Sequence, residues 1–116
     1  MNEMELKKRT KQFTLRVIKL VSALPGSMEG RAIGNQLIRS GTSVGANYRA
    51  ACRGRSKAEF IAKLGTVEEE ADESAYWMEL IIESGLLKAR LVEPLLLEAN
   101  ELVAIMVSSR KSAAKP

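Results

Sequence analysis

Histidine is absent from this 116-residue chain, and cysteine occurs only at Cys52. Without histidine the chain lacks the usual general base at neutral pH, the commonest zinc ligand and every catalytic triad built on imidazole. A lone cysteine forms no internal disulfide, and with no histidine to activate it a structural thiol is favoured over a nucleophile. We therefore expect no enzymatic activity, with no catalytic residue, no metal site and no cofactor.

Long apolar runs are also missing. The longest covers residues 102–107, whereas a membrane helix needs about 20 apolar residues. The charged residues near the start of the chain lead into no apolar core of the kind that a secretion signal contains. We expect a protein of the cytoplasm with no membrane partner.

Aromatic residues make up only 4% of the chain, whereas hydrophobic residues make up 46% and charged residues 28%. This composition is that of an ordinary globular protein, and the length suits a single domain. The core must therefore be mostly aliphatic.

The net charge of +4 is unevenly distributed along the chain. Residues 1–24 carry a net +4, and residues 30–58, which follow the single acid Glu29, carry +6 with no acid. Residues 59–84 carry −7 and residues 85–116 carry +2. Such alternation suits segments that pack against one another, and the surplus of base in the first half can face an anionic partner.

Apolar or small residues recur at helical spacing in four segments, and no segment alternates like a strand. The first segment, residues 6–24, ends at Pro25-Gly26-Ser27, because proline cannot continue the helical hydrogen bonds. Its stripe consists of Leu6, Thr10, Phe13, Val17, Leu20 and Leu24.

The second segment, from about Met28 to about Arg53, is rich in glycine. Because each glycine costs a helix roughly 1 kcal/mol relative to alanine, a loop at residues 40–46 is the competing interpretation. We favour one continuous helix, since small residues there let another backbone come close and packing can offset the loss. Its stripe consists of Ile33, Leu37, Gly41, Val44, Tyr48 and Ala51.

The third segment begins at the capping box Ser56-Lys57-Ala58-Glu59, and Gly85 is its expected stop. Glu93-Pro94 suits the first turn of a fourth, shorter helix. The third stripe consists of Phe60, Leu64, Val67, Ala71, Ser74, Met78 and Ile81, and the fourth of Leu95, Ala99, Leu102 and Met106.

The predicted fold is all-α, an antiparallel up-down-up-down four-helix bundle over residues 1–107 with a flexible basic tail at residues 108–116. Apolar residues outside the stripes exceed what a slim monomeric bundle needs. They are Ile18, Val21, Trp77, Ile82, Leu96 and Val103. An extra apolar face is often buried against a copy of the same chain, so we expect a homo-oligomer.

Three stretches carry a more specific pattern, namely QLIRSGTSVGANY at residues 36–48, SKAEFIAKL at 56–64 and EEADESAYW at 69–77. They resemble the four-helix-bundle family of 23S rRNA-intervening-sequence proteins, and the likeness runs from Phe13 to about Leu102. The resemblance implies a small bacterial protein, a ring-like homopentamer, no assigned catalytic activity and a continuous helix through Gly41. It also implies kinship with the accessory protein of diversity-generating retroelements, a basic pentamer that works with a reverse transcriptase and nucleic acid.

The chain departs from that family at one point. Many members carry an acid shortly after the Ala-Asn pair, whereas here Ala46-Asn47 is followed by Tyr48-Arg49. The departure raises the local positive charge.

Two basic clusters are the candidate nucleic-acid contacts. One lies at the tip that joins the second and third helices, and the other lies near the start of the chain. The first consists of Arg49, Arg53, Arg55 and Lys57, and the second of Lys7, Lys8, Arg9 and Lys11. Lysine and arginine side chains release counterions from a nucleic acid when they neutralise its phosphates. The contributions of such clusters to binding therefore add up around an oligomer. The competing interpretation is a solvated helix end whose cations complement the helix dipole.

An acidic block at residues 68–73 has no histidine with which to form a di-metal site. If the second and third helices turn near Arg55, Arg39 comes level with Ala71 and within reach of Glu70 or Glu73. We expect a structural ion pair there that fixes the register between the helices.

The sequence thus predicts a non-enzymatic, homo-oligomeric helical-bundle protein that binds RNA or DNA through basic helix ends. The alternative is a protein-interaction adaptor or scaffold that uses the surplus apolar surface and Trp77 and makes no direct nucleic-acid contact.

Overall fold

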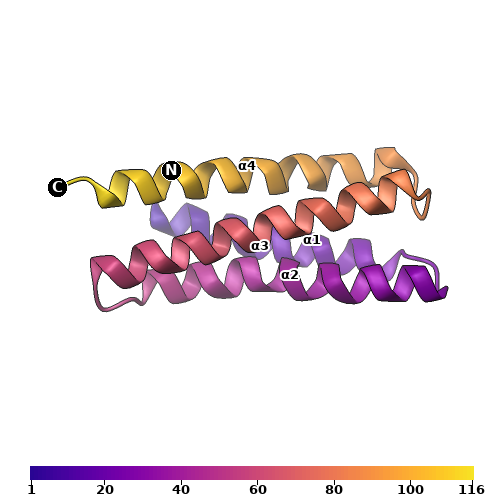
Figure 1. Ribbon diagram of the computed structural model, residues 1–116, viewed down its shortest axis with the longest axis horizontal. Coiled ribbons are helices and arrows are strands. Elements are labelled where there is room, and N and C mark those ends of the chain that lie inside the picture. Colours follow the sequence, from indigo (N-terminus) through magenta and orange to yellow (C-terminus); the bar gives the residue numbers. More distant parts are fainter.

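Four helices make up most of the computed structural model, which describes residues 1–116 (Figure 1). They are α1 (Glu3–Ser22), α2 (Met28–Cys52), α3 (Lys57–Glu83) and α4 (Ala89–Ala114). Chain neighbours run antiparallel, so both termini and the α2–α3 turn lie at one end and the other two turns lie at the opposite end. The predicted all-α four-helix bundle is therefore confirmed. None of the helices combines the length and the apolar character needed to cross a membrane.

The turns on either side of α3 carry the expected end signals. Ser56 Oγ accepts a hydrogen bond of 3.1 Å from the Glu59 N–H, and the Glu59 carboxylate accepts one of 2.8 Å from the Arg55 N–H. The reciprocal bond of the capping box thus reaches one residue further back than the usual pattern. At the other end Gly85 has a φ of 75°, and its N–H donates to the Ile82 carbonyl at 3.1 Å. This left-handed glycine ends α3 as predicted.

The four predicted stripes meet in a single core. All stripe residues are buried except Leu24, Ile33 and Phe60, which lie near helix ends and pack partly buried against the core. Burial of each large apolar side chain contributes roughly 1.5–3 kcal/mol. The largest fully buried side chains are Phe13, Leu37, Leu64, Met78, Ile81, Leu102 and Met106.

Helix α2 is unbroken from Met28 to Cys52, so the loop alternative at residues 40–46 is wrong. Gly41 is buried against α1, and its carbonyl accepts a hydrogen bond of 2.9 Å from Thr14 Oγ1. Close packing of this kind offsets the low helix propensity of glycine.

Helix α4 begins earlier than predicted. It starts at Ala89 rather than near Glu93, so Pro94 lies inside the helix instead of in its first turn. Val92 is fully buried in the core and anchors the additional turn.

Helix α4 also ends later than predicted. It continues to Ala114 and is longer than α1, so the bundle boundary expected at residue 107 and the expected short fourth helix are wrong. Residues 108–114 contain no glycine or proline to stop the helix. Arg110 Nη2 lies 2.8 Å from Glu68 Oε1, which ties this last part of α4 to α3.

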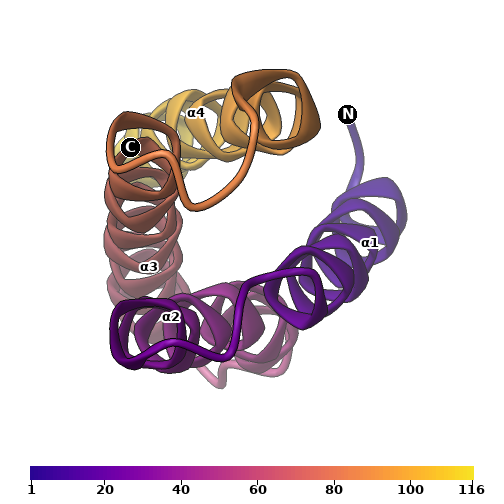
Figure 2. The ribbon, with the colours of Figure 1, turned by 90° about the vertical axis from the view of Figure 1, so that its right-hand side faces the viewer.

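The bundle is open between α1 and α4, which form the least extensive of its helix contacts. Seen end-on, these two helices stand apart at the end that carries the α1–α2 and α3–α4 turns (Figure 2). A groove of about 360 Å³ lies between the second half of α1 and the start of α4. Its lining consists of Arg16, Lys19, Leu20, Ala23, Leu87, Leu91, Pro94 and Leu95.

Apolar side chains are exposed on α1 and α4, but they differ from the expected set. Of the apolar residues outside the predicted stripes, only Ile18 is exposed, and the others are partly buried and pack against the core. The structure exposes Leu15 on α1 and Leu91 and Leu97 on α4 instead.

Candidate functional site

A groove of about 450 Å³ lies between α1 and α2, and we call it the basic groove. Lysines enter it from α1 and arginines from α2, and the other lining residues are uncharged. The lining consists of Lys7, Lys11, Thr14, Thr42, Gly45, Ala46, Arg49 and Arg53. The two predicted basic clusters, separated by more than one helix in the sequence, therefore each contribute two cations to one site.

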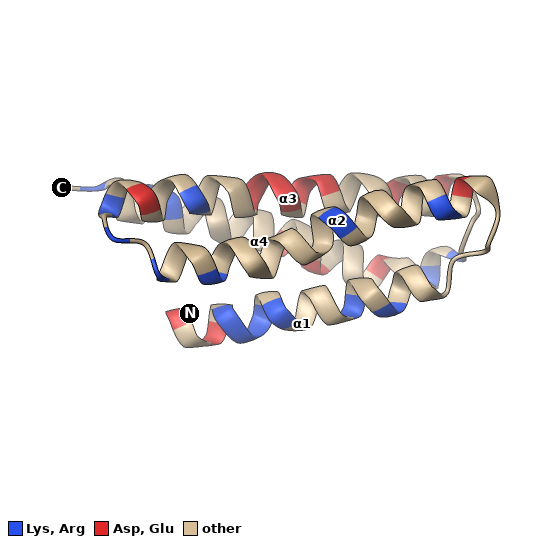
Figure 3. Cartoon of the chain, turned by 90° about the horizontal axis from the view of Figure 1, so that it is seen from below, with Lys and Arg blue, Asp and Glu red and all other residues tan.

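Antiparallel packing of α1 and α2 brings these cations together. The start of α1 lies at the same end of the molecule as the end of α2 (Figure 3). Residues four apart share a helix face, so Lys7 and Lys11 on one helix, and Arg49 and Arg53 on the other, point into the same groove.

Small residues keep the two helices close together at the floor of the basic groove. A Cβ built on Gly45 would lie 3.2 Å from Thr14 Oγ1 and 3.3 Å from the Thr10 carbonyl oxygen. A larger side chain there would fill the groove or separate the helices.

Carboxylates are scarce around the basic groove. Lys7 Nζ lies 3.5 Å from Glu3 Oε1, and this pair is weak because both side chains are well exposed. The other three cations form no ion pair. The acidic block lies in the middle of α3, away from the groove (Figure 3). Neighbouring cations without counter-charges create a positive potential that favours an anionic ligand.

Arg9 is not part of the basic groove, because it faces α4. Its Nε and Nη2 atoms each lie 2.7 Å from a Glu98 oxygen, and Nη2 also lies 3.1 Å from Glu101 Oε1. The hydrogen bonds to Glu98 raise the pKa of the Arg9 guanidinium above its ordinary value. Arg9 therefore joins α1 to α4 instead of facing a ligand.

The remaining predicted cations also lie outside the basic groove. Lys8 is exposed on α1, and Arg55 is exposed in the α2–α3 turn. Lys57 Nζ donates to the Lys115 carbonyl at 2.8 Å. A phosphate contact by these three side chains stays a prediction.

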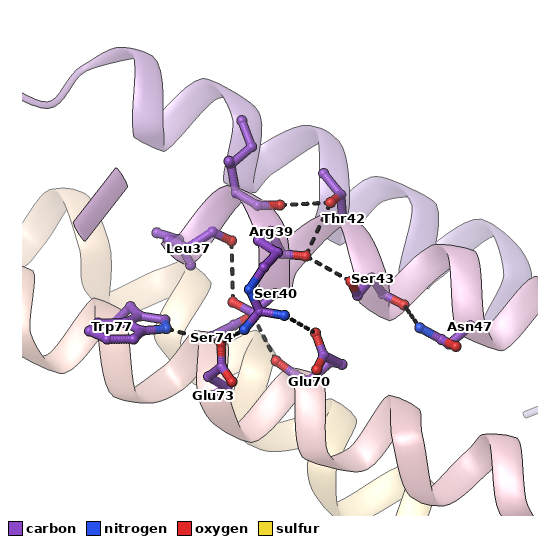
Figure 4. Close-up of polar contacts among 11 residues, drawn as sticks. Leu37, Arg39, Ser40, Thr42, Ser43, Asn47, Glu70, Glu73, Ser74 and Trp77 are labelled. Carbon is purple, nitrogen blue, oxygen red and sulfur yellow. Dashed lines mark hydrogen bonds and ion pairs between the residues drawn. The ribbon is translucent and has the colours of Figure 1, made fainter. Parts of the chain in front are cut away.

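Arg39 of α2 lies where the register of the α2–α3 hairpin placed it (Figure 4). Its Nη2 is ion-paired with Glu73 Oε2, and its Nη1 lies 3.7 Å from Glu70 Oε2. The Trp77 indole N–H also donates to Glu73 Oε2, at 3.2 Å. Beneath them the buried hydroxyl of Ser74 lies 3.0 Å from that of Ser40. This network links α2 to α3, and its role in fixing the register between them stays a prediction.

Cys52 lies next to the basic groove, near Tyr48 and Glu3. Burial raises the pKa of the Cys52 thiol, and the neighbouring Glu3 acts in the same direction, while the Tyr48 hydrogen bond opposes them. Burial likewise raises the pKa of the Tyr48 phenol. A thiol held in its neutral form suits a structural residue better than a nucleophile.

Residues 2–108 match the family described as 23S rRNA-intervening sequence protein. The chain belongs to this family. A similar crystal structure is that of a protein with unknown function from the S23 ribosomal protein family of Bacteroides thetaiotaomicron VPI-5482. It is 32% identical, with a TM-score of 0.88, and the alignment covers 96% of this chain and 99% of that one. No curated protein matches the chain.

Membership of the 23S rRNA-intervening sequence protein family confirms the resemblance read from the sequence. The two residues that follow Ala46-Asn47 lie in different environments. Tyr48 is buried in the core, whereas Arg49 lines the basic groove. Arg49 therefore adds a cation to the groove.

Proposed function

We propose that this 23S rRNA-intervening sequence family member is a non-enzymatic homo-oligomer that binds RNA or DNA through the basic groove. The observation that supports the proposal most is the convergence of Lys7 and Lys11 with Arg49 and Arg53. Only Lys7 among them has a carboxylate partner. Nucleic acid is the favoured ligand because a row of cations matches a chain of phosphates.

The physical basis of binding would be counterion release. Each phosphate that a cation neutralises contributes a slope of about −0.7 for a single strand, or about −0.9 for duplex DNA, to the dependence of log K on log salt concentration. An oligomer presents one basic groove for each chain, so a long nucleic acid can contact several at once and bind with higher avidity.

Self-association is supported by exposed apolar side chains on α1 and α4, the two helices with the least extensive contact in the bundle. Leu15 is 50% exposed, Leu91 53% and Leu97 61%. Exposed apolar surface of this kind is stabilised when a second copy of the chain covers it. The pentameric number, the bacterial cytoplasm and the kinship with a retroelement accessory protein rest on the family resemblance.

The alternative function, a protein-interaction adaptor, is supported by a different surface. Tyr76 is 53% exposed and packs edge-to-face against Trp77, with ring centroids 5.1 Å apart. Aromatic side chains of this kind often anchor protein interfaces. An adaptor would bind its partner through this surface without using the basic groove.

A salt series with two matched double variants tests the proposed function. We would measure binding of labelled RNA and DNA by fluorescence anisotropy, with native mass spectrometry on the same samples. Arg49→Ala/Arg53→Ala removes two groove cations, and Arg55→Ala/Lys57→Ala removes the same charge outside the groove. We expect the first pair to weaken binding roughly tenfold or more and to reduce the salt slope by about 1 to 2, and the second pair to have a smaller effect. No binding at low salt by an intact wild-type oligomer would leave the adaptor as the function to pursue.

A further inference from the structure

Two threonine hydroxyls in the basic groove donate hydrogen bonds to backbone carbonyls. Thr14 Oγ1 donates to the Gly41 carbonyl at 2.9 Å, and Thr42 Oγ1 donates to the Ile38 carbonyl at 2.7 Å. A hydroxyl carries one proton and two lone pairs. While these bonds hold, each oxygen has lone pairs with which to accept a hydrogen bond from a ligand but no proton to donate.

The cations and the acceptors occupy different parts of the basic groove. Thr14 follows Lys11 by three residues on α1, and Thr42 precedes Arg49 by seven residues on the antiparallel α2. At about 1.5 Å per residue, the acceptors lie about 5 to 10 Å along the helices from these cations. The floor beside Thr42 is formed by Gly45 and Ala46, so a ligand can come close to the helix backbone.

A phosphate is the poorer partner for these two threonines, because each hydroxyl can donate to a phosphate oxygen only by giving up its hydrogen bond to a carbonyl. A ribose suits them better, since its 2′-hydroxyl has a proton to donate. Deoxyribose lacks this group, and the 2′-hydroxyl is what lets a protein distinguish RNA from DNA at a given site.

We infer that the basic groove binds the backbone of single-stranded RNA in preference to DNA, with phosphate at Arg49 and Arg53 and a ribose 2′-hydroxyl donating to Thr42 or Thr14. This inference rests on the proposed function and gives it a substrate class. The cations hold any nucleic acid, and the acceptors add a contact that only ribose completes.

The test compares three single strands of one sequence, namely RNA, DNA and 2′-O-methyl RNA, on the full chain at one salt concentration. The 2′-O-methyl group keeps the oxygen and removes the proton, so it isolates donation by the ligand. We expect RNA to bind roughly three- to tenfold more tightly than DNA, the size of one or two net hydrogen bonds, and 2′-O-methyl RNA to bind like DNA.

Threonine variants locate the effect. Thr42→Val keeps the side-chain shape and removes the acceptor, so it should lower RNA affinity more than DNA affinity and thereby reduce the RNA preference. Thr66→Val is the matched control, because Thr66 Oγ1 also donates to a carbonyl of its own helix, that of Ala62, but lies on α3 outside the groove. It should leave the RNA preference intact.

The outcomes separate this inference from the proposed function. Equal affinity for RNA and DNA, or tight binding of 2′-O-methyl RNA, would overturn the inference and leave nucleic-acid binding standing. An RNA preference that survives in both Thr42→Val and Thr14→Val would also overturn it. No binding of any strand would overturn both.

Discussion

Gly41 of α2 lies so close to Val17 of α1 that a Cβ built on the glycine would stand 2.6 Å from Val17 Cγ1. Atoms of two side chains cannot approach to that distance, so only glycine allows the observed packing of α1 on α2. A second close approach one turn further along α2, at Gly45, forms the floor of the basic groove.

Gly41→Ala should therefore destabilise the bundle. Overpacking costs about 1 to 3 kcal/mol, and the higher helix propensity of alanine returns about 1 kcal/mol, so we expect the free energy of unfolding to fall by up to about 2 kcal/mol. Gly65→Ala on α3 is the control, because nothing lies within 4 Å of the added Cβ. It should raise stability by about 0.5 to 1 kcal/mol in the same urea titration. Equal effects of the two variants on the free energy of unfolding would show that helix propensity alone determines the result and that the contact with Val17 does not.

The Arg9–Glu98 pair should be the main polar attachment of α1 to α4. The Arg9 side chain is 25% exposed and that of Glu98 is 15% exposed, which places the pair between exposed pairs and buried ones. We expect Arg9→Ala to lower the free energy of unfolding by about 1 to 2 kcal/mol. Lys8→Ala, at an exposed neighbour without an ion pair, should have almost no effect.

A double-mutant cycle with Glu98→Ala isolates the pair. The expected coupling is about 1 kcal/mol or more. Additive single effects would show that the Arg9–Glu98 pair does not stabilise the packing of α1 against α4.

Stability should depend on pH near the ordinary pKa of a thiol. The folded protein raises the Cys52 pKa through burial, with Glu3 in the same direction and Tyr48 and Lys7 opposing. The folded state thus keeps the thiol proton longer than the unfolded chain. The free energy of unfolding should be unaffected by this group below the unfolded pKa of about 8.5 and should fall as the pH rises from there towards the raised pKa. Urea titrations at pH 7.5, 8.5 and 9.5 check this, and Cys52→Ala should flatten the decline.

Helix positions and faces could be predicted from the sequence because apolar spacing has a direct physical cause. Leu37, Leu64 and Leu102 are all buried where periodicity placed them. The start of α4 could not be predicted in this way, because Pro94 is tolerated within the helix once burial of Val92 supports the turn before it. Local propensity favoured a helix start near Glu93, whereas tertiary packing sets the start at Ala89.

The candidate site was predictable only in part. Arginines and lysines stand out in a sequence, but which of them face one another depends on the register of α1 against α2. Arg9 and Lys11 look equivalent in the sequence, yet one pairs with Glu98 and the other lines the basic groove. The acceptor role of Thr42 depends on its hydroxyl donating to the Ile38 carbonyl, and only the structure shows that hydrogen bond.

Glu3 is the one carboxylate that forms an ion pair with a cation of the basic groove, so it should weaken anion binding. Glu3→Gln removes the charge 3.5 Å from Lys7 Nζ. We expect RNA to bind about two- to fivefold more tightly at low salt, with the gain shrinking as salt is added. Glu93→Gln on α4, which makes the same charge change away from the groove, should have little effect. A similar gain in both variants would indicate a response to net charge alone.

Lysine footprinting of the protein with and without bound RNA tests the central claim most directly. Acetylation with mass-spectrometric readout compares groove lysines with Lys63 and Lys88, which lie on other faces of the same molecule. If nucleic acid lies in the basic groove, Lys7 and Lys11 become protected while Lys63 and Lys88 keep their reactivity. Protection of Lys63 and Lys88 with unchanged modification of Lys7 and Lys11 would contradict the account.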